Sequence, residues 1–209
     1  IKENCSRLEC DDQVTMADLV KNSLRMRPDR IVVGEVRGSE AQDLMTAMNV
    51  GKYCIGTIHA ATARETVMRL QNEPMNVPEV LINLIDVFVI MRRYSIAGKT
   101  RRVIGELVET AGMEKKMVLL SPLWEFDFPN NRFSESAISS IYRDKLAQIS
   151  GRSTIEIMDE LKIRAGILNA LLNKGIKDFK AVTEFCRSYI ADNTAALNEL
   201  GLKKANLLR

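Results

Sequence analysis

The feature that most constrains the fold is a pair of short apolar runs, each followed by a helix start. The first run, IVVGE at residues 31–35, is rich in β-branched side chains, and the second, YCIGTI, covers residues 53–58. Continuous apolar runs of this length are typical of parallel strands that are buried on both faces. We therefore predict two strands of an open, mostly parallel α/β sheet.

Helix signals surround both runs and complete a strand–helix alternation. The T-x-x-E sequence from Thr62 to Glu65 is a capping box, which starts a helix directly after the second run. Four further elements are expected up to residue 93: helices over 15–27, 39–51 (with Ser39 as N-cap) and 77–85, and a strand over 86–93.

The pattern changes after residue 93. Two runs, 100–109 and 116–126, are joined by a glycine-containing turn and predict antiparallel strands that close the domain. The sequence FPNNRF at 128–133 is interpreted as a boundary. The remainder has helical spacing and predicts a small bundle of three to five helices. We thus expect one α/β domain over residues 1–128 and a helical subdomain over 134–209.

Composition narrows the function classes. The formal net charge is +3, with Lys+Arg and Asp+Glu balanced at 18 each over residues 1–134 and at 12 against 9 over 135–209. So mild an excess argues against nucleic-acid binding, which needs a dense basic surface. The four cysteines form no C-x-x-C pair, so we expect reduced thiols rather than a zinc site or disulfides. No apolar run reaches the length of a membrane span.

The single histidine and one glutamate each stand at the C-terminal end of a predicted strand. Glu35 ends the first apolar run, and His59 follows the second, with Thr57 two residues before it. The carboxyl ends of parallel strands form the edge at which open α/β sheets bind ligands. In nucleotide hydrolases, a carboxylate there holds the magnesium shell or orients the attacking water. Two structural alternatives stay open at this point. Glu35 is a solvent-facing carboxylate at the sheet edge, paired with Arg37, and His59 is a surface residue or a hydrogen-bond partner.

Two long segments are similar to those of a known family. The first is DLVKNSLRMRPDRIVVGEVRGSEAQDLMTAMNVG and the second is GTIHAATARETVMRL. They resemble the secretion ATPase superfamily, which includes the motor ATPases of type II and type IV secretion, type IV pili, tight-adherence pili and the archaellum. The resemblance covers about residues 7–127. It implies an α/β fold with a RecA-like P-loop NTPase core over 1–128, followed here by a C-terminal α-helical bundle.

The resemblance also implies roles for five residues. IVVGE corresponds to the Walker B element, so Glu35 would be the catalytic acid and would hold Mg²⁺ through water. GTIHA corresponds to the histidine box, in which His59 would sense the γ-phosphate and Thr57 would join the same network. Arg7 and Arg37 lie in matching segments, and arginines of this family contribute to phosphate binding. ATP and Mg²⁺ are therefore the implied ligands.

One motif of that family is absent from the sequence. No G-x-x-x-x-G-K-[ST] occurs, and the Gly-Lys pairs at 51–52 and 98–99 lack the upstream glycine. That loop supplies the backbone N–H groups that hold the phosphates. We therefore expect the chain to be the C-terminal part of such an ATPase and to be inactive alone. Because the strand before that loop lies inside the sheet in this fold class, we also expect unpaired strand edges.

The implied function is ATP hydrolysis in a hexameric ring that drives pilin assembly or protein export. The ring would be cytoplasmic, at the cytoplasmic face of the membrane, beside an inner-membrane platform protein and the pilin or secreted-protein machinery. No direct nucleic-acid contact is expected. Two alternatives stay open: residues 135–209 are a non-catalytic module that binds the platform partner, or a related motor moves DNA or effector proteins.

Overall fold

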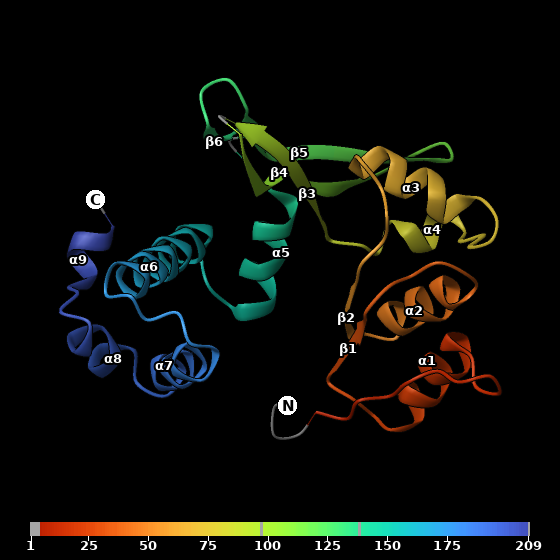
Figure 1. The fold of residues 1–209 in the computed structure, drawn as a ribbon, viewed down its shortest axis with the longest axis horizontal. Coiled ribbons are helices and arrows are strands. Elements are labelled where there is room, and N and C mark those ends of the chain that lie inside the picture. Colours follow the sequence, from red (N-terminus) through yellow and green to blue (C-terminus); the bar gives the residue numbers. More distant parts are fainter. Residues whose placement is uncertain (1–4, 97, 138, 209) are drawn as a thin grey trace. The chain divides into compact units, whose positions relative to one another are not determined.

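The chain forms two compact units in a computed structural model that describes residues 5–96, 98–137 and 139–208 (Figure 1). The first unit is Ile1–Tyr142 and the second is Arg143–Arg209. The sequence placed the boundary at 128–133. The first unit extends beyond it because strand β6 (Arg132–Glu135) pairs with β5 (Met117–Asp127).

The two predicted apolar runs form a parallel pair of strands. β1 (Arg30–Val33) lies beside β2 (Tyr53–Gly56), with Val33 opposite Gly56. Helix α1 (Met16–Arg25) begins at a capping box, and α2 (Glu40–Asn49) buries an apolar stripe that includes Leu44. This arrangement confirms the predicted strand–helix alternation over the first 56 residues. The prediction that both strands are buried on both faces was wrong, because the core covers only the face of β1 that carries Ile31 and Val33, and β2 has no fully buried residue.

Two local helix predictions were wrong. Ser39 makes no side-chain cap bond at α2, because its backbone is already helical at φ −63° and ψ −18°. The carboxylate of Glu40 takes that place and accepts hydrogen bonds from the backbone N–H groups of Arg37 and Gly38, at 2.6 and 2.9 Å. The helix predicted over 77–85 is a single turn, α4 (Glu79–Ile82).

The strand predicted over 86–93 does not join the parallel layer. It is the start of β3 (Val87–Ile96), which pairs antiparallel with β4 (Lys99–Glu114) in a four-stranded sheet of order β3-β4-β5-β6. Parallel pairing needs a crossover connection of a dozen or more residues, and the β3–β4 connection is far too short for one. The antiparallel pairing predicted for 100–109 and 116–126 is confirmed in β4 and β5.

One hydrophobic core joins both sheets of the first unit. Helix α3 (Ala63–Gln71), which starts at the predicted Thr62 cap, contributes Val67 to this core. β1 contributes Ile31, β3 contributes Phe88 and β5 contributes Val118. In β4, Gly105 leaves room for the Arg92 side chain, because a Cβ there would collide with its Cγ.

The second unit is helical, as predicted. Its helices are α5 (Ile141–Ser150), which starts at the end of the first unit, α6 (Thr154–Asn173), α7 (Phe179–Ala191), α8 (Asn193–Glu199) and α9 (Lys204–Leu207). α6 starts at the predicted capping box and ends before Gly175, at φ +72°, and Asp178 caps α7. The core of this unit includes Ile167 and Phe185.

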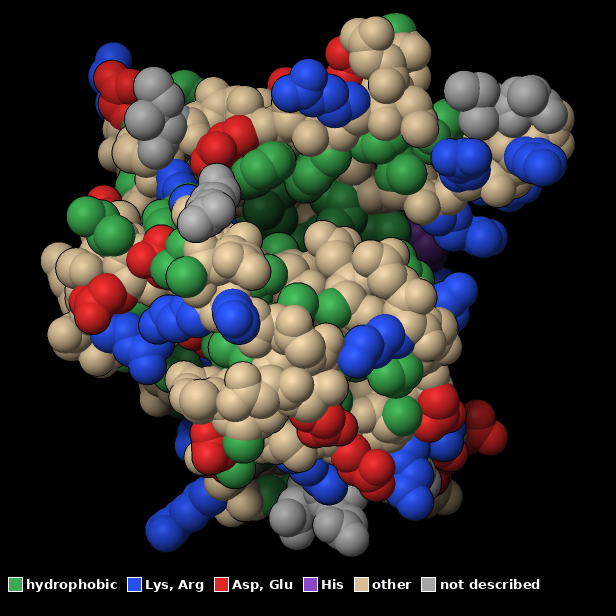
Figure 2. Space-filling view, turned by 90° about the vertical axis from the view of Figure 1, so that its left-hand side faces the viewer, with side chains coloured by type: hydrophobic (Ala, Val, Ile, Leu, Met, Phe, Trp, Pro, Cys, Tyr) green, Lys and Arg blue, Asp and Glu red, His purple; other side chains and the backbone are tan. Residues whose placement is uncertain are grey.

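The surface carries mixed charge. Figure 2 shows one face of the molecule, on which Lys and Arg side chains occupy several separate places among acidic and hydrophobic ones. Among the described residues, no helix combines the length and the apolar character that a bilayer crossing requires.

Candidate functional site

The parallel register brings the two predicted site segments together. Just past the paired ends of β1 and β2, the backbone N–H of Val36 donates to the Thr57 carbonyl at 2.8 Å. The Thr57 hydroxyl donates in turn to the Gly34 carbonyl. Thr57 therefore bridges the two strand ends through both its main chain and its side chain, and it fixes the separation of the residues that follow.

Three charged or ionisable side chains meet at this edge. Glu35 Oε1 lies 2.6 Å from Arg37 Nε and 2.9 Å from His59 Nε2. This oxygen is shielded from solvent, and neither N–H is aligned to make a hydrogen bond with it. The Arg37 contact is therefore an ion pair, and the His59 contact is one only when the imidazole is protonated. The side chains of Arg37 and His59 are 73% and 82% exposed, whereas Glu35 is 30% exposed. The carboxylate is thus partly covered by two exposed side chains, both of which are accessible to a ligand.

The electrostatics keep this carboxylate ionised. The pKa of Glu35 is lowered, first by its contact with Arg37 and then by the charges of Arg37 and His59, while desolvation acts in the opposite direction. Glu35 raises the pKa of Arg37 in return. At neutral pH the group is an anionic acceptor, which is the state needed to orient a water molecule or to contact a hydrated cation.

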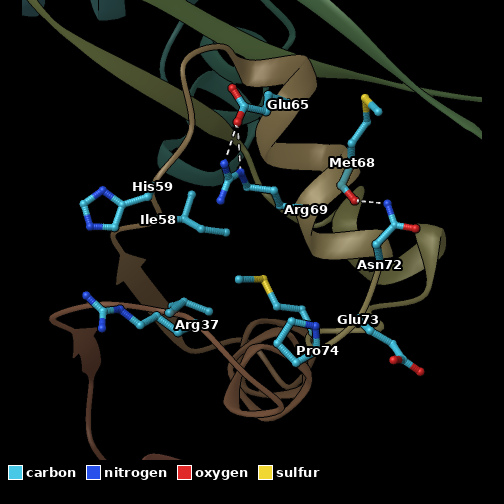
Figure 3. A pocket seen from close by; sticks show the side chains of 11 residues that line it. Arg37, Ile58, His59, Glu65, Met68, Arg69, Asn72, Glu73 and Pro74 are labelled. Atoms are coloured by element: carbon cyan, nitrogen blue, oxygen red, sulfur yellow. Dashed lines mark hydrogen bonds and ion pairs between the residues drawn. The ribbon is translucent and has the colours of Figure 1, made fainter.

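A pocket of about 440 Å³ opens beside the cluster. Figure 3 shows Arg37 and His59 at one end, and Asn72, Glu73 and Pro74 at the other. The other lining residues are Val36, Ile58, Glu65, Met68, Arg69 and Met75.

One wall of the pocket is held by Glu65 of α3. Its carboxylate accepts from the Ala61 N–H at 2.7 Å and lies 2.8 Å from Arg69 Nη2. These contacts lower the pKa of Glu65, the backbone bond of Ala61 most of all. Glu65 and Arg69 therefore offset each other's charge, while Arg37 and His59 at one end of the pocket and Glu73 at the other are exposed.

Four of the five predicted site residues lie in this region. Arg7 does not join them; its Nη2 atom lies 2.6 Å from Glu9 Oε1 in an exposed ion pair. The sequence did not predict the roles of Glu40 and Glu65, which fix the loops on either side of the cluster. The capping box marked Glu65 as a helix-start residue, but nothing in the sequence indicated that this residue lines a pocket. Among the described residues, no group of three or more His, Cys, Asp or Glu could hold a metal ion.

Comparisons with known proteins identify the class to which this fold and site belong. The family model described as type II/IV secretion system protein matches residues 2–113, more than half of the chain. The chain therefore belongs to that family.

Individual proteins are also similar to this chain in sequence. An uncharacterized protein of Methanocaldococcus jannaschii is 33% identical over 161 residues, which are 76% of this chain and 59% of the relative. Conjugal transfer protein TrbB of Rhizobium radiobacter is 39% identical over 107 residues, 48% of this chain and 32% of that protein. Type IV secretion system protein PtlH of Bordetella pertussis is 35% identical over 103 residues, 44% and 30% respectively. The chain thus spans less than two thirds of each of these relatives.

Proposed function

We propose that this chain is the C-terminal part of an ATP-hydrolysing motor of a secretion or pilus system, with a partial RecA-like core over residues 1–128 and a helical subdomain over 134–209. The observation that carries the proposal is the meeting of Glu35, Arg37 and His59 at the carboxyl edge of two parallel strands. Family membership and the relatives named for conjugal transfer and type IV secretion support a transport role.

Each side chain has a role in this proposal. Glu35 is the catalytic acid, which accepts a hydrogen bond from the attacking water and orients it. His59 turns from Glu35 to the γ-phosphate and so reports its presence. Thr57 keeps the two strand ends in register, and Arg37 offsets phosphate charge. Arg7 contributes to the phosphate site only after it leaves Glu9.

The residues present suit the terminal phosphate and its metal ion. The Glu35 carboxylate, which stays ionised beside Arg37, is an oxygen ligand of the kind that a hydrated cation takes, and it becomes accessible when His59 turns to the phosphate. A single carboxylate suffices, because Mg²⁺ in nucleotide sites keeps several waters and takes its other ligands from the phosphates. When bound, Mg²⁺ would neutralise charge on the phosphate oxygens. The described residues offer no glycine-rich loop for the remaining phosphates, so the proposal assigns that loop to a longer protein.

The wider setting follows from the same proposal. We infer a hexameric ring at the cytoplasmic face of the membrane, in contact with an inner-membrane platform protein and with pilin or secreted-protein machinery. The cargo in this proposal is a pilin, an effector protein or DNA.

The test is a comparison of ATP turnover by residues 1–209 and by the longer gene product. We expect no turnover from residues 1–209, and turnover from the longer protein that falls at least about 100-fold with His59→Ala. Asn72→Ala, at the far end of the pocket, serves as the matched control and should leave turnover within about twofold. If residues 1–209 hydrolyse ATP and the Glu35→Gln variant does so equally well, two proposals are refuted: that the ATP site is incomplete in this chain, and that Glu35 is the catalytic acid.

A further inference from the structure

The β3–β4 hairpin carries a concentrated positive charge. Residues 91–104 contain five Lys and Arg side chains and no Asp or Glu. Arg92 is neutralised by Glu106, with Nη2 3.0 Å from Oε1. Within the described parts of the chain, the other four have no acidic side chain within ion-pair distance: Arg93, Lys99, Arg101 and Arg102.

Two of these arginines oppose each other across the strands. Arg93 of β3 is the direct partner of Arg102 of β4, so both side chains stand on the same face of the hairpin. Both are exposed. Like charges directly opposite on neighbouring strands are destabilising, and this arrangement lacks an anion of its own chain to offset the repulsion. The pair is therefore arranged to receive negative charge from outside the chain.

Apolar side chains continue the same face away from the arginines. Met91 pairs with Ile104, and Val89 pairs with Leu107, so all four share the face of Arg93 and Arg102. Val89, Met91 and Ile104 are 52%, 60% and 39% exposed. We call this set, Val89, Met91, Arg93, Arg102 and Ile104, the outer hairpin face. It combines an uncovered aliphatic strip with a fixed pair of cations at one end.

The chemistry of the outer hairpin face favours a protein ligand. Its exposed apolar members are aliphatic, whereas single-stranded nucleic acid is held by free aromatic faces. Trp124, which lies opposite Leu107, is already stacked on Phe133, with the ring centroids 5.3 Å apart. The apolar side chains lie along a sheet, whereas interfacial membrane elements use an amphipathic helix that sinks its apolar face into the lipid. Guanidinium groups suit carboxylates, which they bind in a bidentate manner.

We propose that the outer hairpin face docks an acidic amphipathic segment of a partner protein. The apolar side chains of that segment cover Val89, Met91 and Ile104, and its carboxylates neutralise Arg93 and Arg102. The proposal concerns partner recognition and does not depend on ATP hydrolysis.

The single tryptophan provides the assay. Trp124 lies on the same face as Leu107, so its emission reports occupancy of the outer hairpin face. The probe is an 18-residue synthetic peptide without aromatic residues, with Leu at helical spacing and Glu on both flanks. We expect it to shift Trp124 emission and to bind more weakly as salt rises. The same peptide with Lys in place of Glu, a single-stranded DNA 20-mer and phosphatidylcholine–phosphatidylglycerol vesicles should leave the emission unchanged.

Paired variants locate the site. The double variant Arg93→Glu with Arg102→Glu should weaken binding of the acidic peptide at least about tenfold. The control, Lys180→Glu with Arg187→Glu on α7, makes the same change in net charge and should bind as the parent chain does. Met91→Ser tests the apolar strip with the charges intact and should weaken binding about threefold or more. Unchanged binding by the arginine variant, or tighter binding of the DNA or the vesicles than of the acidic peptide, would overturn the proposal.

Discussion

The buried carboxylate of Glu109 offers a sharp test of how the first unit is held together. Glu109 lies in the middle of β4, yet it is only 2% exposed. It accepts hydrogen bonds from the Ser140 hydroxyl at 2.7 Å and from the backbone N–H groups of Ile141 and Tyr142 at 3.0 Å each. A strand residue therefore anchors the N-terminus of α5, the helix that leads into the second unit.

The expected cost of removing this carboxylate follows from those three bonds. A hydrogen bond to a charged group contributes about 1.5–3 kcal/mol when it is buried, and an ordinary one about 1 kcal/mol. Only the Ser140 bond is fully buried, and the other two are partly so. We therefore expect Glu109→Ala to lower the free energy of unfolding of the first unit by about 3 kcal/mol. Glu109→Gln keeps part of the acceptor geometry and should cost about half as much.

Urea unfolding followed by Trp124 fluorescence measures this effect, because the only tryptophan lies in β5 of the same sheet. Glu114→Ala, at the exposed end of β4, is the matched control for the loss of one negative charge from that strand. A Glu109→Ala variant that unfolds within about 1 kcal/mol of the control would refute the anchoring role.

Three further predictions concern other parts of the first unit. Gly105→Ala should destabilise the β3–β4 pairing by about 1–3 kcal/mol, measured by thermal unfolding, because its Cβ would overlap the neighbouring Arg92 side chain. The pKa of Glu35 is lowered in the folded chain, so its ionised form stabilises the fold above its ordinary pKa of 4.5, and this stabilisation is lost as the pH falls through the folded-state pKa. Arg37→Gln should raise the pKa of Glu35 in a carboxyl-carbon NMR titration. An unchanged pKa would show that Arg37 is not the cause of the shift. Val32 and Ile55 are 70% and 62% exposed on one face of the parallel pair, so Ile55→Thr should reduce concentration-dependent self-association in light scattering.

Local signals in the sequence predicted the elements that local physics determines. Thr62 and the Ser153–Glu156 capping box mark true helix starts, because a cap joins residues three positions apart. The predicted box at Thr62 is only half formed, because the Glu65 carboxylate accepts from the Ala61 N–H instead of the Thr62 backbone. The β-branched run at 31–35 predicted a strand whose Ile31 and Val33 are buried. The meeting of Glu35 and His59 followed from the parallel pairing of β1 and β2, which two apolar runs separated by a helix predicted.

Sequence patterns failed where distant residues decide the structure. An apolar run such as 86–93 does not reveal whether its partner is parallel or antiparallel, and the short connection into β4 decided the matter. Ser39 has the right residue type for a cap, but Glu40 takes over the cap because it reaches two backbone N–H groups. Arg7 matched a family segment, yet its nearest acid, Glu9, holds it elsewhere. The Glu109 anchor joins residues more than 30 positions apart and has no local signature.

The role proposed for Glu35 is tested most directly by measuring nucleotide binding and hydrolysis separately in the longer protein that we propose to contain this chain. Glu35→Gln keeps the size of the side chain and removes its charge. We predict that this variant binds ATP with an affinity within about threefold of the parent protein but hydrolyses it at least about 100-fold more slowly in a single turnover. Glu73→Gln, in the same pocket but outside the charge cluster, should change neither quantity. Hydrolysis by Glu35→Gln at the parent rate would show that Glu35 is not the catalytic acid.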